Sequence, residues 1–211
     1  GREAGFRGGR IAGEYTVSNL KTMGIEPLFE SYYQPFEAYN KERQKKGRFQ
    51  VHPDSIAKLK QGVHQKLSMN NILGKIEGKN PNEYVIIGAH YDHLGFDPML
   101  DGDRVYNGAD DNASGVSAVL QVAKAFLATG VQPERTVIFA FWDGEEKGLL
   151  GSKYFVQTFL EMDKVKGYLN YDMIGRNKDE SKPMHVVYFY TEAHPVFGDW
   201  LKNDIKKYGL N

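Results

Sequence analysis

The sequence predicts an α/β fold, a three-layer domain in which helices flank a mixed, mainly parallel central sheet. Short runs of almost wholly apolar residues, such as residues 135–142, are typical of strands that are buried on both faces. Between these runs lie segments such as residues 112–129, whose apolar side chains recur at helical spacing. Because strands and helices that alternate in this way build a sheet with helices on its faces, we expect a layered domain.

The N-terminal part of the chain predicts one helix and one edge strand. In residues 10–24 apolar side chains recur roughly at helical spacing, and Gly24 suits the end of the helix. Residues 28–37 are rich in aromatic side chains and contain Pro35, which suits a strand at the edge of a sheet. Residues 39–65 are charged and lack a clear period. We expect a solvated excursion there, with a lid over the site as the alternative.

The middle of the chain predicts a hairpin followed by a helix. Residues 70–78 alternate apolar and polar positions, and after a turn residues 84–89 form the next strand, which leads toward the centre of the sheet. A glycine-containing loop over residues 96–108 then precedes the helix of residues 112–129. Gly130 closes that helix.

The remaining elements continue the alternation. Strands are expected over residues 135–142, 165–171 and 185–190. Helices are expected over residues 149–162 and 195–208, the second of which begins at a proline. This pattern completes the predicted α/β domain.

The composition limits the classes of partner. The 211 residues are 41% hydrophobic and 13% aromatic, enough for one sizeable core and one domain. Lys plus Arg equals Asp plus Glu at 27 each, so no positive excess favours nucleic acid or an anionic membrane surface. The absence of cysteine excludes disulfides, thiolate zinc sites and cysteine nucleophiles. No apolar run approaches the roughly 20 residues of a membrane span.

Acidic and imidazole side chains gather where the predicted strands end. These residues are His90, Asp111, the adjacent pair Glu145 and Glu146, and Asp172. Ligand sites in open α/β sheets lie beyond the carboxyl ends of the strands, so the residues converge on one edge. Several carboxylates in a partly buried site need a cation, because otherwise some of them would become protonated. Nitrogen and oxygen ligands without sulfur fit zinc.

Spacing adds to this interpretation, although each residue alone has a structural explanation. A histidine at the end of a strand is usually hydrogen-bonded, and an aspartate before a helix usually caps it. His90 and Asp92 are two residues apart, so in extended backbone they face one side and Asp92 would accept the other ring N–H of His90. Glu145 and Glu146 are adjacent, so their side chains diverge. One of the two glutamates would bind the metal, and the other would act on a metal-bound water molecule.

Four motifs in order resemble the co-catalytic (di-zinc) bacterial aminopeptidase family of metallopeptidases. They are Gly-Ala-His-Tyr-Asp at 88–92, Asn-Gly-Ala-Asp-Asp-Asn-Ala-Ser-Gly at 107–115, Asp-Gly-Glu-Glu-Lys-Gly-Leu-Leu-Gly-Ser at 143–152 and Tyr-Leu-Asn-Tyr-Asp-Met-Ile-Gly at 168–175. The opening Gly-Arg-Glu-Ala-Gly at 1–5 is also similar to that of the family. The resemblance implies the zinc aminopeptidase/phosphorylase-like fold.

The resemblance also implies roles for the metal ligands. His90 and Asp172 would bind one zinc, Glu146 would bind the other, and Asp111 would bridge the two ions. The family commonly has a cis peptide at the corresponding aspartate, which predicts one between Asp111 and Asn112.

By the same resemblance, Glu145 is the general base and Asp92 orients His90. The implied function is that of a zinc-dependent aminopeptidase, which hydrolyses N-terminal residues of peptides through a metal-activated water. Peptides are then the expected partners, and many such enzymes are periplasmic or secreted.

One ligand of the family pattern has no counterpart in the sequence. The second zinc needs a histidine several tens of residues beyond Asp172, whereas the histidines downstream, His185 and His194, lack its context. His93 is expected to line the pocket and not to bind metal. We therefore expect residues 1–211 to be a single catalytic domain that is incomplete at its C-terminus, with the missing ligand beyond Asn211. Two zinc ions are expected in the full-length enzyme, and the activity of the shorter chain is left open.

Two other functions remain as alternatives. One is a catalytically silent, peptidase-like interaction domain, against which the retained ligands argue. The other is an enzyme similar to the glutaminyl cyclases, which share this fold and work with one zinc. The long motifs at 107–115 and 143–152 favour the peptidase.

Overall fold

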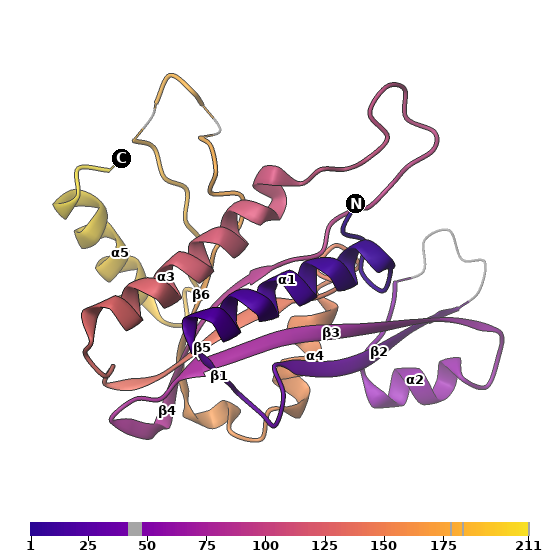
Figure 1. Ribbon diagram of the computed structural model, residues 1–211, viewed down its shortest axis with the longest axis horizontal. Helices are drawn as coiled ribbons and strands as arrows, with labels where there is room; N and C mark the ends of the chain where they lie inside the picture. The colour runs from indigo at the N-terminus through magenta and orange to yellow at the C-terminus, as the bar shows by residue number, and fades with distance from the viewer. Residues whose placement is uncertain (42–47, 178, 183, 211) are drawn as a thin grey trace. The chain divides into compact units, whose positions relative to one another are not determined.

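Six strands form one mixed sheet in the computed structural model, which describes residues 1–41, 48–177, 179–182 and 184–210 (Figure 1). The order is β1-β3-β5-β4-β6, and β2 also pairs with β3. β5 and β6 run parallel to β4, whereas β1, β2 and β5 are antiparallel to β3. The strands are β1 (Glu26–Pro27), β2 (Tyr33–Lys41), β3 (His64–Ile76), β4 (Asn80–His90), β5 (Arg135–Trp142) and β6 (Val165–Asn170).

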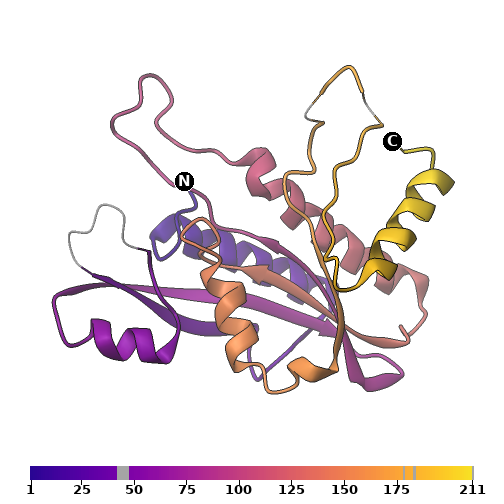
Figure 2. The same ribbon diagram turned by 180° about the vertical axis from the view of Figure 1, so that it is seen from behind.

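Helices cover both faces of this sheet, as Figures 1 and 2 show from opposite sides. α1 (Arg7–Met23) and α3 (Gly115–Thr129) lie on one face, and α4 (Leu150–Thr158) lies on the other. The predicted fold class, a mixed sheet between helical layers, is confirmed, but the sheet is not mainly parallel. Parallel pairing is limited to β4–β5 and β4–β6, whereas β3 pairs with β1, β2 and β5 in antiparallel fashion.

β5 explains why the layers form. Its seven residues from Thr136 to Trp142 are all buried. Phe139 and Phe141 pack into the core beneath α1 and α3, whereas Ile138 and Trp142 pack toward α4. Because successive side chains of a strand point to opposite faces, one apolar run supplies both cores. Burial of each such side chain stabilises the fold by about 1.5–3 kcal/mol.

The helices largely follow their predicted ranges. α1 ends at Met23, and Gly24 adopts the left-handed conformation (φ 77°) that ends a helix most easily without a Cβ atom. α3 and α4 lie inside the ranges predicted for them. Among the described residues, every helix is too short or too polar to cross a membrane.

The predicted hairpin between residues 70–78 and 84–89 is wrong. β3 and β4 follow each other in the sequence but do not pair, because β5 lies between them and bonds to both. The reason is the burial of β5. A strand whose two faces are both apolar is most stable at the centre of a sheet, where it also has a hydrogen-bonded strand along each edge.

Residues 39–65 contain the end of β2, the helix α2 (Pro53–Leu59) and the start of β3. Tyr39 forms an isolated antiparallel bridge with Gln50. Residues 42–47 of the predicted excursion lie outside the described part of the chain.

The chain divides into two compact units, Gly1–Met173 and Ile174–Asn211. The second unit contains α5 (Pro195–Lys207), which the sequence predicts. The strand predicted over residues 185–190 is not formed. Phe189 is 93% exposed, so the apolar composition of this segment does not reflect burial in a sheet.

Two short helical elements complete the description. η2 (Met162–Lys164) precedes β6. η1 (Ala109–Ser114) precedes α3 and contains non-helical backbone at Asp111 and Asn112. The peptide bond between these two residues is cis, as predicted.

Candidate metal centre

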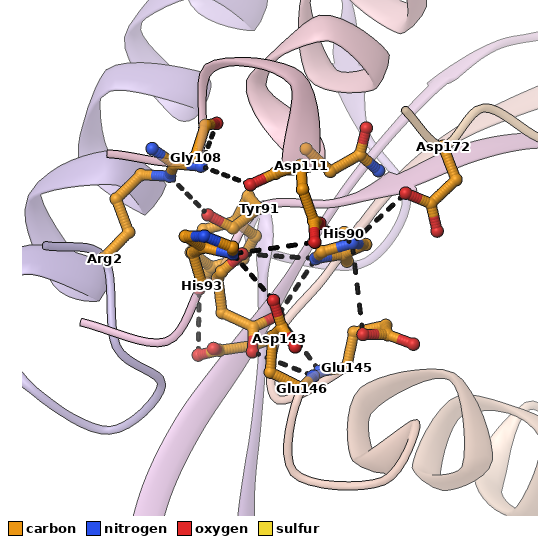
Figure 3. Close-up of polar contacts among 12 residues, drawn as sticks. Arg2, His90, Tyr91, His93, Gly108, Asp111, Asp143, Glu145, Glu146 and Asp172 are labelled. Carbon is orange, nitrogen blue, oxygen red and sulfur yellow. Dashed lines mark hydrogen bonds and ion pairs between the residues drawn. The ribbon is translucent and has the colours of Figure 1, made fainter. Parts of the chain in front are cut away.

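The carboxyl ends of three parallel strands meet at one edge of the sheet. β4 ends at His90, which lies opposite Trp142, the last residue of β5. β6 pairs with the other side of β4, and Asp172 follows its last residue, Asn170, by two positions. Because parallel strands end at the same edge, polar side chains from distant parts of the sequence gather there (Figure 3).

His90, Asp111 and Asp172 form a first group of potential metal ligands. His90 Nε2 lies 3.1 Å from Asp111 Oδ1 and 3.5 Å from Asp172 Oδ1. One ligand atom of each residue lies within 4.8 Å of the other two. The His90 ring is buried, whereas both carboxylates are partly exposed. An imidazole nitrogen and carboxylate oxygens suit zinc, and an accessible side suits a catalytic ion.

His93, Asp111 and Glu146 form a second group. His93 Nδ1 lies 2.7 Å from Glu146 Oε1 and 3.9 Å from Asp111 Oδ2. Asp111 therefore belongs to both groups, with Oδ1 toward the first and Oδ2 toward the second. A carboxylate shared in this way has the geometry of a bridging ligand.

His93 lies closer to the site than the sequence predicts. In an extended strand it would face away from His90, which argues against a role as a ligand. β4 ends at His90, however, so this alternation does not continue to His93. The backbone N–H of His93 donates to the carbonyl of Arg2 at 2.9 Å, and its ring contacts Tyr106 edge to face. Two histidines three residues apart at a strand end were the available signal for this arrangement.

Asp92 is fully buried and holds the loop that carries both glutamates. Its Oδ1 accepts a hydrogen bond from the backbone N–H of Glu145 at 3.0 Å, and its Oδ2 accepts one from Glu146 at 3.3 Å. His90 Nδ1 lies 3.2 Å from the backbone carbonyl oxygen of Asp92 and 3.6 Å from its Oδ1. The sequence predicts that the Asp92 carboxylate orients His90. In the structure the backbone carbonyl is at hydrogen-bond distance, and the carboxylate binds the glutamate loop.

The carboxylates at this edge shift the protonation equilibria of His90 and Glu145. Burial of the His90 ring opposes its protonation most, but the contacts with the Asp172 and Asp92 carboxylates and their negative charges together outweigh burial and raise its pKa to about 10. A metal that binds His90 must displace this proton. Burial raises the pKa of Glu145. The positive charge of His90 opposes this rise, and the negative charge of Asp92 adds to it. Glu145 Oε2 lies 4.0 Å from His90 Nε2.

Arg2 fixes the backbone around the shared aspartate. Its guanidinium donates to the carbonyl oxygens of Tyr91 at 3.1 Å, Asn107 at 2.7 Å, Gly108 at 2.8 Å and Asp111 at 3.4 Å. Desolvation lowers the pKa of Arg2, and the charges of two nearby aspartates oppose that change. The sequence does not predict this role of Arg2. It shows only that residues 1–5 are similar to the opening residues of the family.

The neighbouring residue Glu3 makes a further connection to the site. It accepts a hydrogen bond from Lys147 Nζ at 2.9 Å. The N-terminal segment is thus tied both to the Asp111 loop and to the loop of the two glutamates.

Asp143 lies beneath the site and directly follows β5. Its Oδ2 accepts hydrogen bonds from the backbone N–H of Asn70 at 3.1 Å and from the hydroxyl of Tyr91 at 3.0 Å. Its Oδ1 is buried without a hydrogen-bond partner among the described residues. Burial, together with the charge of Asp92, raises the pKa of Asp143 to about 7.

Solved structures share this fold. A Zn-dependent exopeptidase from Parabacteroides distasonis superposes with a TM-score of 0.59 at 22% identity, over 83% of this chain and 57% of that protein. LapB from Legionella pneumophila superposes with a TM-score of 0.58 at 23% identity, over 87% of this chain and 42% of that protein. At these identities the likeness concerns the fold.

Curated relatives are similar at the sequence level. Leupeptin-inactivating enzyme 1 of Streptomyces exfoliatus is 39% identical over 107 residues, which are 50% of this chain and 22% of that protein. An aminopeptidase of Pseudomonas aeruginosa strain UCBPP-PA14 is 38% identical over 115 residues, which are 54% of this chain and 19% of that protein. The matched segment thus spans about a fifth of the length of these relatives. Residues 71–211 match Peptidase family M28, and this chain belongs to that family.

Proposed function

We propose that this chain carries the metal centre of a zinc-dependent exopeptidase, an aminopeptidase that removes N-terminal residues from peptides. The observation that carries the proposal is the position of Asp111. Its two carboxylate oxygens face two separate groups of potential ligands, and both groups lie beside the loop of Glu145 and Glu146. The names of the similar proteins, among them aminopeptidases and a Zn-dependent exopeptidase, support the same activity.

The donor set supports two zinc ions. His90, Asp111 and Asp172 would hold the first ion, and Asp111 and Glu146 would hold the second. Bound zinc supplies Lewis-acid chemistry, which polarises the peptide carbonyl and lets water attack it at neutral pH.

Glu145 acts as the general base in this proposal. It takes a proton from the attacking water and passes it to the nitrogen of the leaving amine, so that its carboxylate is regenerated in each cycle. Its raised pKa supports this role, because a base works best when its pKa lies close to the operating pH. Its backbone hydrogen bond to Asp92 supports a fixed position beside His90.

The histidine that would complete the second zinc site is proposed to lie beyond Asn211. His93 is the other candidate, because its Nδ1 lies within hydrogen-bond distance of Glu146. Peptides are the proposed substrates, and a periplasmic or secreted location follows from the family resemblance alone.

One experiment tests the proposed function. Zinc content and the hydrolysis of aminoacyl-anilides are measured for the 211-residue chain and for the full protein. We expect the full protein to bind two zinc ions and to release the anilide. A full protein that binds zinc but hydrolyses neither anilides nor peptides would reject the proposal and favour a silent interaction domain.

A further inference from the structure

Two adjoining cavities lie beside the loop of Glu145 and Glu146. The larger, of about 570 Å³, is lined by both glutamates and by residues 147–149. The smaller, of about 270 Å³, extends away from the glutamates as far as Lys153. Arg48 and Phe49 line both cavities, as do Lys147 and Gly148, so the two form one cleft that leads away from the metal centre. Its volume is in the range of small-ligand sites.

The acidic side chains of the cleft are confined to one end. Glu145 and Glu146 line only the larger cavity, next to the metal centre. Arg48 and Lys147 line both cavities, Lys153 lines only the smaller one, and none of the described residues that line the smaller cavity is an aspartate or a glutamate.

The basic side chains of the cleft differ in how far their charge is already neutralised. Lys147 pairs with Glu3 at 2.9 Å. Lys153 Nζ donates to the backbone carbonyl of Gly148 at 2.9 Å, a neutral acceptor that leaves its charge intact. Arg48 is exposed. Within the part of the chain that the structure describes, neither Lys153 nor Arg48 forms an ion pair, so these two side chains would attract an anionic group.

A short peptide has a matching distribution of charge. Its N-terminal amine is cationic, its scissile bond lies one residue further on, and its C-terminal carboxylate is anionic. If the amine lies at the metal centre, as the proposed function requires, the rest of the peptide extends away from Glu145. The cleft offers apolar contacts from Phe49 and Leu149.

We infer that the cationic end of this cleft binds a carboxylate of the peptide, downstream of the bond that is cleaved. This inference rests on the proposed function and narrows its substrates to peptides that carry a carboxylate in that stretch. The carboxylate has two sources, the C-terminus of a short peptide or an aspartate or glutamate side chain. Arg48 binds it with its planar fork of donors, and Lys153 binds it as a compact charge.

Three peptides of equal length separate the sources of the carboxylate. Leu-Ala-Ala with a free C-terminus carries one carboxylate, Leu-Ala-Ala-amide carries none, and Leu-Ala-Asp-amide carries it on a side chain. Because a hydrogen bond to a charged group contributes to binding but solvent weakens it at this exposed site, we expect a KM about fivefold to tenfold lower for the free acid than for the amide. A similarly low KM for Leu-Ala-Asp-amide would show that the cleft binds carboxylates in general. A KM as high as that of Leu-Ala-Ala-amide would show that it binds only the peptide C-terminus.

Variants test whether the lower KM for the free acid depends on the side chains of the cleft. In Arg48→Gln and Lys153→Gln the ratio of KM values for amide and acid should fall toward one. Lys124→Gln is the matched control, because Lys124 is an exposed lysine of α3 that does not line the cleft. This control should keep the full preference. Equal KM values for acid and amide in the unaltered protein would overturn the inference.

A binding measurement distinguishes this inference from the proposed function. Calorimetric titration of the Glu145→Gln protein with the same peptides gives dissociation constants without turnover. If the unaltered protein cleaves the amide but the dissociation constants of acid and amide are equal, only the inference fails. If the unaltered protein cleaves none of the three peptides, the proposed activity fails, and the same titration still decides whether the cleft binds carboxylates.

Discussion

The carboxylate of Asp92 and the backbone of Glu145 are joined by a hydrogen bond of 3.0 Å, which connects the end of β4 to the loop after β5. The second oxygen of the same carboxylate binds the backbone N–H of Glu146 at 3.3 Å. Gly144, which precedes this pair, has φ +70°, and a Cβ atom there would lie 2.9 Å from Met69 Sδ. The two glutamates are thus positioned through their backbone, which leaves their side chains available for separate roles.

Glu145→Gln should lower turnover by about 10²–10⁴-fold, because the amide cannot accept the proton of the attacking water. The zinc content should stay unchanged, since no proposed ligand is removed. Anilide hydrolysis together with metal analysis checks both expectations. Glu146→Gln is the matched comparison and should lose metal. If Glu145→Gln loses metal and Glu146→Gln does not, the two roles are reversed.

Asp92→Asn should weaken zinc binding and activity by about 10–100-fold each, the usual effect of changing a group that supports metal ligands. An asparagine side chain keeps one acceptor oxygen, but its NH₂ group opposes the second backbone N–H of the glutamate loop. Zinc titration and kcat/KM of the variant test this. Wild-type affinity together with wild-type kcat/KM would show that the loop does not depend on the carboxylate.

His93→Ala should weaken the second metal ion selectively, because His93 contacts Glu146 but does not belong to the group of His90 and Asp172. Competitive titration with a chelator should show one tight ion and one weakened by about 10–100-fold. His194→Ala, an exposed histidine of the second unit, is the control and should change neither ion. Two tight ions in His93→Ala would show that Glu146 does not depend on its contact with His93 to bind the second ion.

Arg2→Lys should lower zinc affinity although the charge is kept. A lysine has a single ammonium group and cannot reach the four carbonyl oxygens that the guanidinium binds. The Asp111 loop then loses part of its support, and both ions should bind more weakly because both depend on this aspartate. Arg10→Lys changes an exposed arginine of α1 and should have no effect. Unchanged zinc affinity in Arg2→Lys would contradict this positioning role.

Asp143→Asn should change how stability depends on pH. The pKa of Asp143 rises from 3.8 to about 7 on folding, so between these values the folded protein holds a proton that the unfolded chain has released. The free energy of unfolding therefore falls as pH rises through this window, by about 4 kcal/mol at most.

The asparagine variant removes this loss because it does not ionise. Urea unfolding of the metal-free proteins at pH 4.5 and pH 8 checks the expectation. The difference between variant and wild type should favour the variant more at the higher pH. Parallel pH profiles for the two proteins would show that Asp143 does not titrate in this range.

The elements with a strong local signal are those that the sequence predicts well. The apolar run of β5 and the helical spacing in α1 and α3 each depend on residues within one segment, so their type follows from the sequence. Pairing depends on distant residues. The sequence places β3 and β4 next to each other, but the insertion of β5 between them could be recognised only from the need of β5 for two neighbours.

The site shows the same limit. The predicted metal residues come together because they follow strands that end at one edge, which sequence order alone indicates. The positions of His93 and Arg2 depend on how the chain turns after leaving β4 and on a contact between residues about a hundred positions apart. No local pattern encodes either position.

The attachment of the N-terminal segment has a consequence for how the protein is made. Arg2 is 109 residues from Asp111 in the sequence, and Glu3 is 144 residues from Lys147. The contact of Arg2 can therefore form only after Asp111 has left the ribosome, and that of Glu3 only after Lys147 has done so. α1 can form early from local contacts, whereas contacts of such long sequence separation form slowly. During synthesis the contacts of Arg2 and Glu3 that support the candidate metal centre thus form late.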